Sequence, residues 1–166
     1  MTKKDPTNAL ELETARHARI ALIQSSWHRD IVDQCCEAFL KGMAARDVPA
    51  AAITRYEVPG AFEIPLHAKL LATSGQCDIV VAAGFVVDGG IYRHEFVAAT
   101  VIDALMRVQL ETLVPVLSAV LTPQQFHEHA VHERFFKEHM VEKGEEAASA
   151  CVATLKNLNA LRRATA

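Results

Sequence analysis

Short apolar runs alternate with segments of helical periodicity along the chain, which predicts a domain of alternating strands and helices. Runs of mainly apolar residues predict strands at residues 19–26, 51–58, 77–87 and 113–122. Apolar residues that recur every three to four positions predict helices at about 30–47, from 64 to the turn at 74–75, and at 95–110. Two further helices are expected, at about 123–139 and at 145–162, with Lys143-Gly144 separating them.

This order predicts a three-layer α/β/α sandwich around a central four-stranded parallel sheet, because parallel strands require crossover connections. Residues 18–163 are expected to form a single domain, and residues 1–17 an N-terminal tail. In open parallel sheets, ligands bind beyond the carboxyl ends of the strands. The segments that follow the four predicted strands are therefore the ones in which functional residues are expected.

Composition and charge exclude several classes of protein. The 166 residues are 51% hydrophobic with a formal net charge of -3, which fits one domain with a substantial core and no basic surface for nucleic acid. No apolar run reaches the ~20 residues of a membrane helix, and the start of the sequence lacks an apolar signal segment. The four cysteines show neither a CxxC pair nor zinc-like spacing, so free buried thiols in the cytoplasm are expected.

Two candidate binding elements follow the first and second predicted strands. Trp27 is the only tryptophan, and at the end of a strand it can either stack on a planar heterocycle or anchor a core or an interface. The sequence VPGAFEIP, residues 58–65, places a Pro-Gly turn before a helix start, where free backbone N–H groups can bind an anion or a polar ring edge. The alternative is a plain strand–turn–helix connection in which Glu63 is only a favourable first-turn charge.

The sequence GGIYRHEF, residues 89–96, follows the third strand and carries the clearest candidates for catalysis. Arg93 can form paired hydrogen bonds with a phosphate, and His94 can act as a general acid or base. The residue types alone leave open which of the two transfers a proton. They also leave open that this is an ordinary solvated helix start.

A histidine-rich segment follows the fourth strand. Its spacing on a helix permits a metal site, but it lacks the HExxH pattern, so no metal is expected. A polar helix face from which His132 or Arg134 reaches a phosphate is the favoured interpretation. The segment contains His127, His129, His132 and His139, and a helix would bring the last three toward one stripe.

Taken together, these segments resemble the lumazine synthase family of riboflavin biosynthesis over about residues 18–160. VPGAFEIP matches the signature octapeptide of that family, and GFVVDG at 84–89 resembles its second signature. VPV at 114–116, LT at 121–122 and KGE at 143–145 keep the order and approximate spacing of the family. The resemblance implies a flavodoxin-like fold and a cytoplasmic transferase that needs no metal or other cofactor.

The resemblance also implies a reaction and a set of site residues. Family members join 5-amino-6-(D-ribitylamino)uracil to 3,4-dihydroxy-2-butanone 4-phosphate, giving 6,7-dimethyl-8-ribityllumazine, phosphate and water. The implied substrate-binding residues are Trp27, Gly60, Ala61, Phe62, Glu63, Val86, Val87, Asp88, Gly90 and Ile91, with Arg93 and His94 in catalysis.

Four positions depart from the usual pattern of the family. Trp27 replaces a phenylalanine, and Ser118 replaces a phenylalanine that often contacts the aromatic substrate. The family's general-acid histidine falls on Arg93, with His94 one place later, and its phosphate-binding arginine falls near His132, with Arg134 two places on.

These departures resemble the divergent, decameric branch of the family, whose members can bind flavins. The resemblance implies self-association into pentamers or decamers with sites between subunits, so that the cation near residue 132 comes from an adjacent chain. It also leaves a second possibility open, a weakly catalytic assembly that binds or stores flavins.

Overall fold

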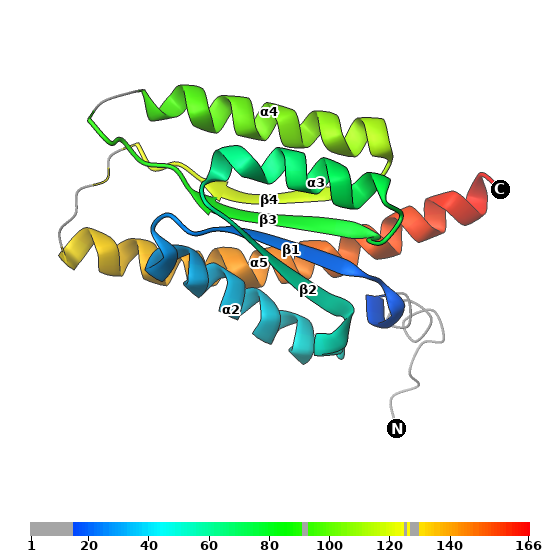
Figure 1. Ribbon diagram of the computed structural model, residues 1–166. Helices are drawn as coiled ribbons and strands as arrows, with labels where there is room; N and C mark the ends of the chain where they lie inside the picture. The colour runs from blue at the N-terminus through cyan, green and yellow to red at the C-terminus, as the bar shows by residue number, and fades with distance from the viewer. Residues whose placement is uncertain (1–14, 91–92, 125, 127–129) are drawn as a thin grey trace.

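Four parallel strands form a single sheet in the order β2-β1-β3-β4 (Figure 1). The structure is a computed structural model that describes residues 15–90, 93–124, 126 and 130–166. The strands are β1 (Ile20–Ser25), β2 (Ile53–Val58), β3 (Ile79–Phe85) and β4 (Val116–Leu121). The register pairs Ile20 of β1 with Ile53 and Ile79 of its two neighbours. The predicted four-stranded parallel sheet is confirmed.

Helices cover both faces of the sheet, as the alternating pattern predicts. In Figure 1, α2 (Arg29–Ala45) and α5 (Ala130–Ala164) lie on one face, and α3 (Ile64–Thr73) and α4 (His94–Thr112) lie on the other. Two short 3-10 helices, η1 (Ala50–Ala52) and η2 (Ala61–Glu63), precede β2 and α3. The expected three-layer α/β/α sandwich is therefore confirmed.

The hydrophobic core lies in two layers because successive side chains of a strand point to opposite faces of the sheet. Every residue of β1 and β3 is buried, which explains why these two strands read as continuous apolar runs. Val81 and Phe85 of β3 pack toward α2 and α5, whereas Val80 and Ala82 pack toward α3 and α4. The central strands thus hold the two outer layers together.

The prediction of two helices near the carboxyl terminus is wrong, because α5 is continuous over 35 residues. Gly144 lies where α5 crosses α2, with its Cα facing the backbone of Cys35 and Phe39. The glycine allows α2 and α5 to pack closely and does not end the helix. This tertiary contact overrides the low intrinsic helix propensity of glycine. Residues 123, 124 and 126 are not helical, so the helix begins after the predicted start at residue 123.

The four cysteines are free and buried, as predicted. Burial raises the pKa of the Cys35, Cys36 and Cys151 thiols to about 12. At neutral pH these groups are therefore protonated and poor nucleophiles. Among the described residues, no helix is both long enough and apolar enough to span a membrane.

Candidate functional site

A solvent-open hollow with an empty volume of ≈ 370 Å³ lies beyond the carboxyl ends of β1, β2 and β3. This is the end of a parallel sheet at which ligands bind, and it lies on the left in Figure 1. We call it the Trp27 hollow. Its walls are mostly apolar and consist of Trp27, His28, Ala61, Phe62, Phe85, Val86, Val87 and Val97.

Trp27 is an exposed side chain, so of the alternatives to a stacking role it is not a core anchor, whereas an anchor at an interface remains compatible with its exposure. Its side chain is 61% exposed, and it projects from the turn between β1 and α2. The ring lies against Gly60: a Cβ atom at that position would be 3.0 Å from Cε3 of Trp27. A large flat ring that is exposed at a strand end suits stacking on a planar ligand.

The residues VPGAFEIP form a strand–turn–helix connection, with η2 directly after the Pro-Gly turn. Ala61 and Phe62 line the Trp27 hollow. The backbone N–H of Gly60, in contrast, donates to Oε2 of Glu63 at 2.8 Å, and the N–H of Glu63 donates to the oxygen of Gly60 at 3.3 Å. Glu63 thus caps the start of this short helix. The N–H of Gly60 is therefore already hydrogen-bonded to the carboxylate of Glu63.

The segment after β3 brings two further predicted residues to the hollow. Val86 and Val87 line it, and the N–H of Val86 donates to the oxygen of Leu121 at 2.9 Å. Oδ1 of Asp88 accepts from the N–H of Gly90 at 2.8 Å and closes the turn, and Gly90 has a φ of 73° that favours glycine. Ile91 is outside the described residues.

Arg93 and His94 do not line the Trp27 hollow in the single chain. Arg93 is the residue before α4, and its guanidinium carbon lies 4.8 Å from the centre of the Phe96 ring. His94, the first residue of α4, is buried, with its Nδ1 atom 3.6 Å from Oε2 of Glu95. The start of α4 therefore presents Arg93 to solvent and keeps His94 inside.

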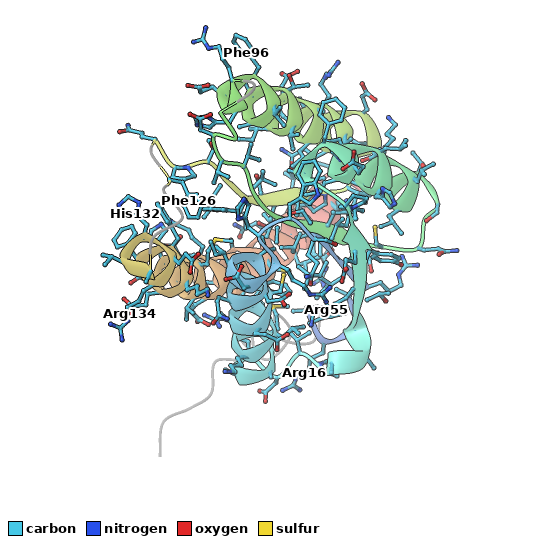
Figure 2. All side chains as sticks on the ribbon, turned by 60° about the vertical axis from the view of Figure 1, so that its left-hand side comes forward. Arg16, Arg55, Phe96, Phe126, His132 and Arg134 are labelled. Atoms are coloured by element: carbon cyan, nitrogen blue, oxygen red, sulfur yellow. The ribbon has the colours of Figure 1, made fainter. Side chains whose placement is uncertain are left out.

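The lining of the hollow also lacks His132, Arg134 and Ser118. His132 packs edge-to-face on Phe136, and Nε of Arg134 lies 3.7 Å from Oε1 of Glu138 on the same helix. Ser118 is exposed in β4, a strand at the edge of the sheet. Figure 2 shows Phe96 on α4, and His132 and Arg134 on α5, two helices that cover opposite faces of the sheet.

Three residues that sequence reasoning did not assign to the site line the Trp27 hollow: His28, Phe85 and Val97. His28 has a left-handed backbone with a φ of 52°, and its ring packs edge-to-face on Phe85 and Phe126. His28 follows the first strand, directly after Trp27, so it is among the residues at which a ligand is expected to bind. Phe85 belongs to GFVVDG, but as the last residue of an apolar strand it reads as core.

Within the described part of the chain, no three His, Cys, Asp or Glu side chains are grouped so that they could hold a metal ion. His129, which belongs to the predicted histidine stripe, and His127 lie outside the described residues. The ring of His139 lies parallel to that of Phe135, with centroids 6.2 Å apart.

Comparison with known proteins agrees with the resemblance in the sequence. Residues 17–159 match the family described as 6,7-dimethyl-8-ribityllumazine synthase. The chain is 58% identical over 143 residues to the 6,7-dimethyl-8-ribityllumazine synthase of Rhodococcus erythropolis, covering 86% of this chain and 92% of that protein. It is 54% identical over 158 residues to the 6,7-dimethyl-8-ribityllumazine synthase 2 of Bradyrhizobium diazoefficiens, covering 95% and 94%. The chain belongs to the 6,7-dimethyl-8-ribityllumazine synthase family.

Proposed function

We propose that this protein condenses 5-amino-6-(D-ribitylamino)uracil with 3,4-dihydroxy-2-butanone 4-phosphate to give 6,7-dimethyl-8-ribityllumazine in riboflavin biosynthesis. The observation that carries the proposal is the Trp27 hollow. In a chain of this family, it combines an exposed flat ring with Ala61 and Phe62 of the signature octapeptide at the ligand end of the sheet.

The chemistry makes modest demands on the protein. The amine attacks the ketone and water leaves, phosphate is eliminated, and the ring closes with loss of a second water. Amine and ketone are already reactive, so most of the acceleration comes from holding them in the correct relative position. The protein also assists proton transfers and accepts the departing phosphate. No step is a net oxidation or reduction, so no redox cofactor is required.

The pyrimidine substrate is assigned to the Trp27 hollow. Trp27 stacks on the ring, and Val86 and Val87 close along its edge. The N–H of Gly60 is already hydrogen-bonded to Glu63. We therefore assign the backbone of Ala61 and Phe62 to the recognition of the polar ring edge and the ribityl chain.

The butanone phosphate is assigned to the turn after β3. In this proposal Gly90, Ile91 and Arg93 hold the phosphate. His94 transfers the proton, which requires its buried ring to turn toward the substrate. Asp88 stabilises this turn by accepting a hydrogen bond from the N–H of Gly90.

We further propose that copies of this chain cover the outer face of α3 and α4 and complete the site. That face exposes Leu66, Leu70, Phe96, Ile102, Met106 and Leu110, an apolar surface that favours contact with another protein chain. Arg93 and its neighbour Phe96 lie at the start of α4, which covers the other face of the sheet from α5, the helix that carries His132 and Arg134. In this proposal, the cation near residue 132 therefore reaches the phosphate from a second chain.

Light scattering tests the assembly. The expected mass is that of a pentamer or a decamer of the 18.2 kDa chain. A monomer at the concentrations used for the assay would contradict the shared site. Met106→Glu, on the exposed face of α4, is expected to shift the population toward smaller species, whereas Lys41→Glu at an exposed position of α2 is not.

The activity test mixes the purified protein with both substrates and follows the absorbance of the lumazine product. Trp27→Phe restores the residue usual in the family and is expected to retain activity, whereas Trp27→Ala is expected to raise KM for the pyrimidine. A wild-type rate no faster than the spontaneous condensation would refute the proposal. It would favour the flavin-storing assembly, which the names of relatives 54–58% identical do not favour.

A further inference from the structure

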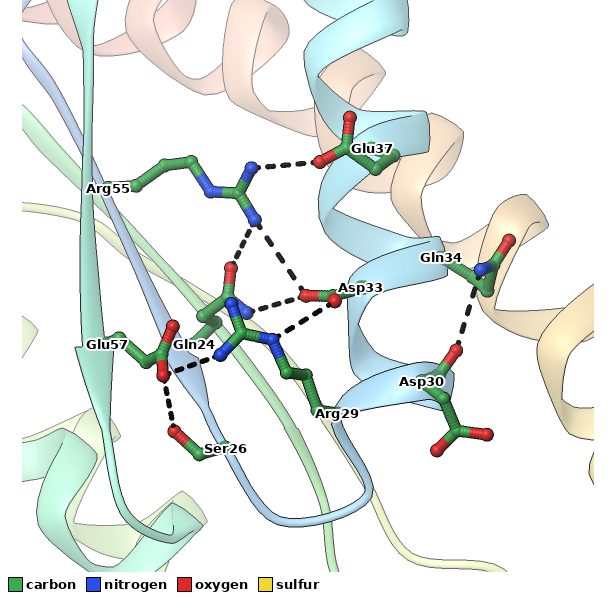
Figure 3. Close-up of polar contacts among 9 residues, drawn as sticks. All are labelled: Gln24, Ser26, Arg29, Asp30, Asp33, Gln34, Glu37, Arg55 and Glu57. Carbon is green, nitrogen blue, oxygen red and sulfur yellow. Dashed lines mark hydrogen bonds and ion pairs between the residues drawn. The ribbon is translucent and has the colours of Figure 1, made fainter.

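A polar network joins β1, β2 and α2 next to the turn that carries Trp27 (Figure 3). Gln24, which is buried, donates through Nε2 to Oδ1 of Asp33 at 2.8 Å and accepts from Arg55. Arg55 also donates to Oε1 of Glu37 at 2.8 Å. This half of the network ties the edge strand β2 to α2.

The other half of the network centres on Glu57 of β2. Its Oε1 atom accepts two hydrogen bonds, from Oγ of Ser26 at 2.9 Å and from Nη1 of Arg29 at 2.8 Å (Figure 3). Ser26 and Arg29 are the residues on either side of Trp27 and His28. One carboxylate oxygen therefore fixes both ends of the turn between β1 and α2.

The turn needs such a restraint because its own backbone is unfavourable. His28 has φ 52° and ψ 44°, a left-handed conformation that costs free energy for a residue with a side chain. Backbone hydrogen bonds hold the first part of the turn: the N–H groups of Ser26 and Trp27 donate to Val58 and Pro59 at 2.8 Å and 3.1 Å. After Trp27, the hydrogen bond from Arg29 to Glu57 ties the end of the turn to the same strand.

We infer that Glu57, through Ser26 and Arg29, is a positioning residue that holds Trp27 in place against Gly60 and thereby sets the affinity for the planar substrate. The part that concerns affinity rests on the proposed function. The part that concerns the orientation of Trp27 does not.

If Glu57 only stabilised the fold, its loss would mainly lower the free energy of unfolding. The side chains of Glu57 and Arg29 are 46% and 55% exposed, and ion pairs between exposed groups contribute little to folding. The carboxylates of Glu57 and Asp33 raise the pKa of the Arg29 guanidinium. Loss of Glu57 should therefore alter the turn more than the overall stability.

Trp27 is the only tryptophan of the chain, so its fluorescence reports on the turn alone. The test compares Glu57→Ala with Glu37→Ala, which removes a carboxylate from the same network but lies on α2, away from the turn. For Glu57→Ala we expect lower fluorescence anisotropy and an acrylamide quenching constant about twice that of the wild type. KM for the pyrimidine substrate should rise several-fold with kcat nearly unchanged, because the ring is less well positioned before binding.

Glu57→Gln is the conservative variant, because its amide oxygen still accepts a hydrogen bond while the charge is lost. It should give intermediate anisotropy and KM, and Glu37→Ala should match the wild type in both. Unchanged anisotropy and quenching in folded Glu57→Ala would refute the positioning role. Increased mobility of Trp27 with unchanged KM would refute the effect on affinity. If the wild type proves inactive, the fluorescence comparison still decides the positioning role, since it requires no substrate.

Discussion

Gly60 lies directly against the ring of Trp27, so close that any side chain at residue 60 would touch it. A Cβ atom there would be 3.0 Å from Cε3 and 3.1 Å from Cζ3 of Trp27, and 3.2 Å from Oε2 of Glu63. The φ of Gly60 is -133°, a value that other residues adopt readily. The glycine is therefore required for close approach to the ring and not for its backbone conformation.

Gly60→Ala is expected to displace Trp27 while leaving the fold intact. The contact requires shifts of a few tenths of an ångström, and an exposed ring can move. Losing about 1 kcal/mol of stacking would raise KM for the pyrimidine substrate roughly fivefold. Steady-state kinetics measure the change, and the fluorescence of Trp27 should change with it.

The control for Gly60→Ala is the same substitution in a Trp27→Phe background. A smaller ring relieves the contact, so the two substitutions should not be additive. Equal effects of Gly60→Ala in both backgrounds would show that the glycine acts through something other than Trp27.

The adjacent residues Arg93 and His94 differ in exposure, and their substitution should affect different kinetic constants. Arg93→Ala is expected to raise KM for the butanone phosphate roughly 10- to 100-fold, because a charged hydrogen bond to the phosphate is lost. His94→Asn is expected to lower kcat about 100-fold, the contribution typical of a general acid or base. Arg107→Ala, on the same helix but paired with Asp103, serves as the control.

Steady-state kinetics with each substrate varied in turn separate these effects. If His94→Asn turns over at the wild-type rate while Arg93→Ala is inactive, no histidine at this turn transfers the proton. Arg93 would then be the group that acts on the departing phosphate.

The strands could be predicted because burial on both faces leaves an unbroken apolar run. Every residue of β3 is buried, and the run at residues 77–87 contains it completely. The candidate site was predictable only in part. The predicted residues that do line the hollow follow adjacent strands, so the ends of these strands bring them together in one chain. They are Trp27, Ala61, Phe62, Val86 and Val87.

What could not be predicted depends on contacts between distant parts of the chain. Phe85 reads as a core residue and also forms a wall of the hollow. Lys143-Gly144 reads as the end of a helix, yet α5 continues through it because α2 packs there. Local preferences carry no information on which helix will cross at a given glycine.

Gly144→Ala is expected to destabilise the protein, although alanine favours helices more than glycine does. The added Cβ atom would lie 2.2 Å from the carbonyl oxygen of Cys35 and 2.9 Å from the amide nitrogen of Phe39, which are backbone atoms of α2. Relieving such contacts means moving a helix, which costs about 2 kcal/mol or more and outweighs a gain of about 1 kcal/mol in helix propensity.

Urea unfolding at a fixed protein concentration measures this change, since association contributes to stability. Ser149→Ala, an exposed position on the same helix, should change the free energy of unfolding by less than about 0.5 kcal/mol. A Gly144→Ala protein as stable as the wild type would contradict the close crossing of α2 and α5.

Asp78 lies at the end of the sheet opposite the Trp27 hollow. Its carboxyl group makes the stability of the protein depend on pH. Its carboxylate accepts hydrogen bonds from the backbone N–H of Arg19 at 2.7 Å and from Nη2 of its guanidinium at 2.8 Å. The side-chain hydrogen bond to Arg19 is the main reason that the pKa of the Asp78 carboxyl lies below its usual value of 3.8. The folded protein therefore binds this proton less readily than the unfolded chain does.

Because the pKa is depressed in the folded state, the stabilisation is fully present above pH 3.8 and is lost as the pH falls through the folded value. Asp78→Asn should therefore be less stable than the wild type at neutral pH, by a small amount because both side chains are partly exposed. The difference should shrink as the solution is acidified below pH 3.8. Urea midpoints measured from pH 7 to pH 3 test this, with Asp103→Asn on the exposed face of α4 as the control. A difference that stays constant over this range would show that the Arg19 pair does not couple protonation to folding.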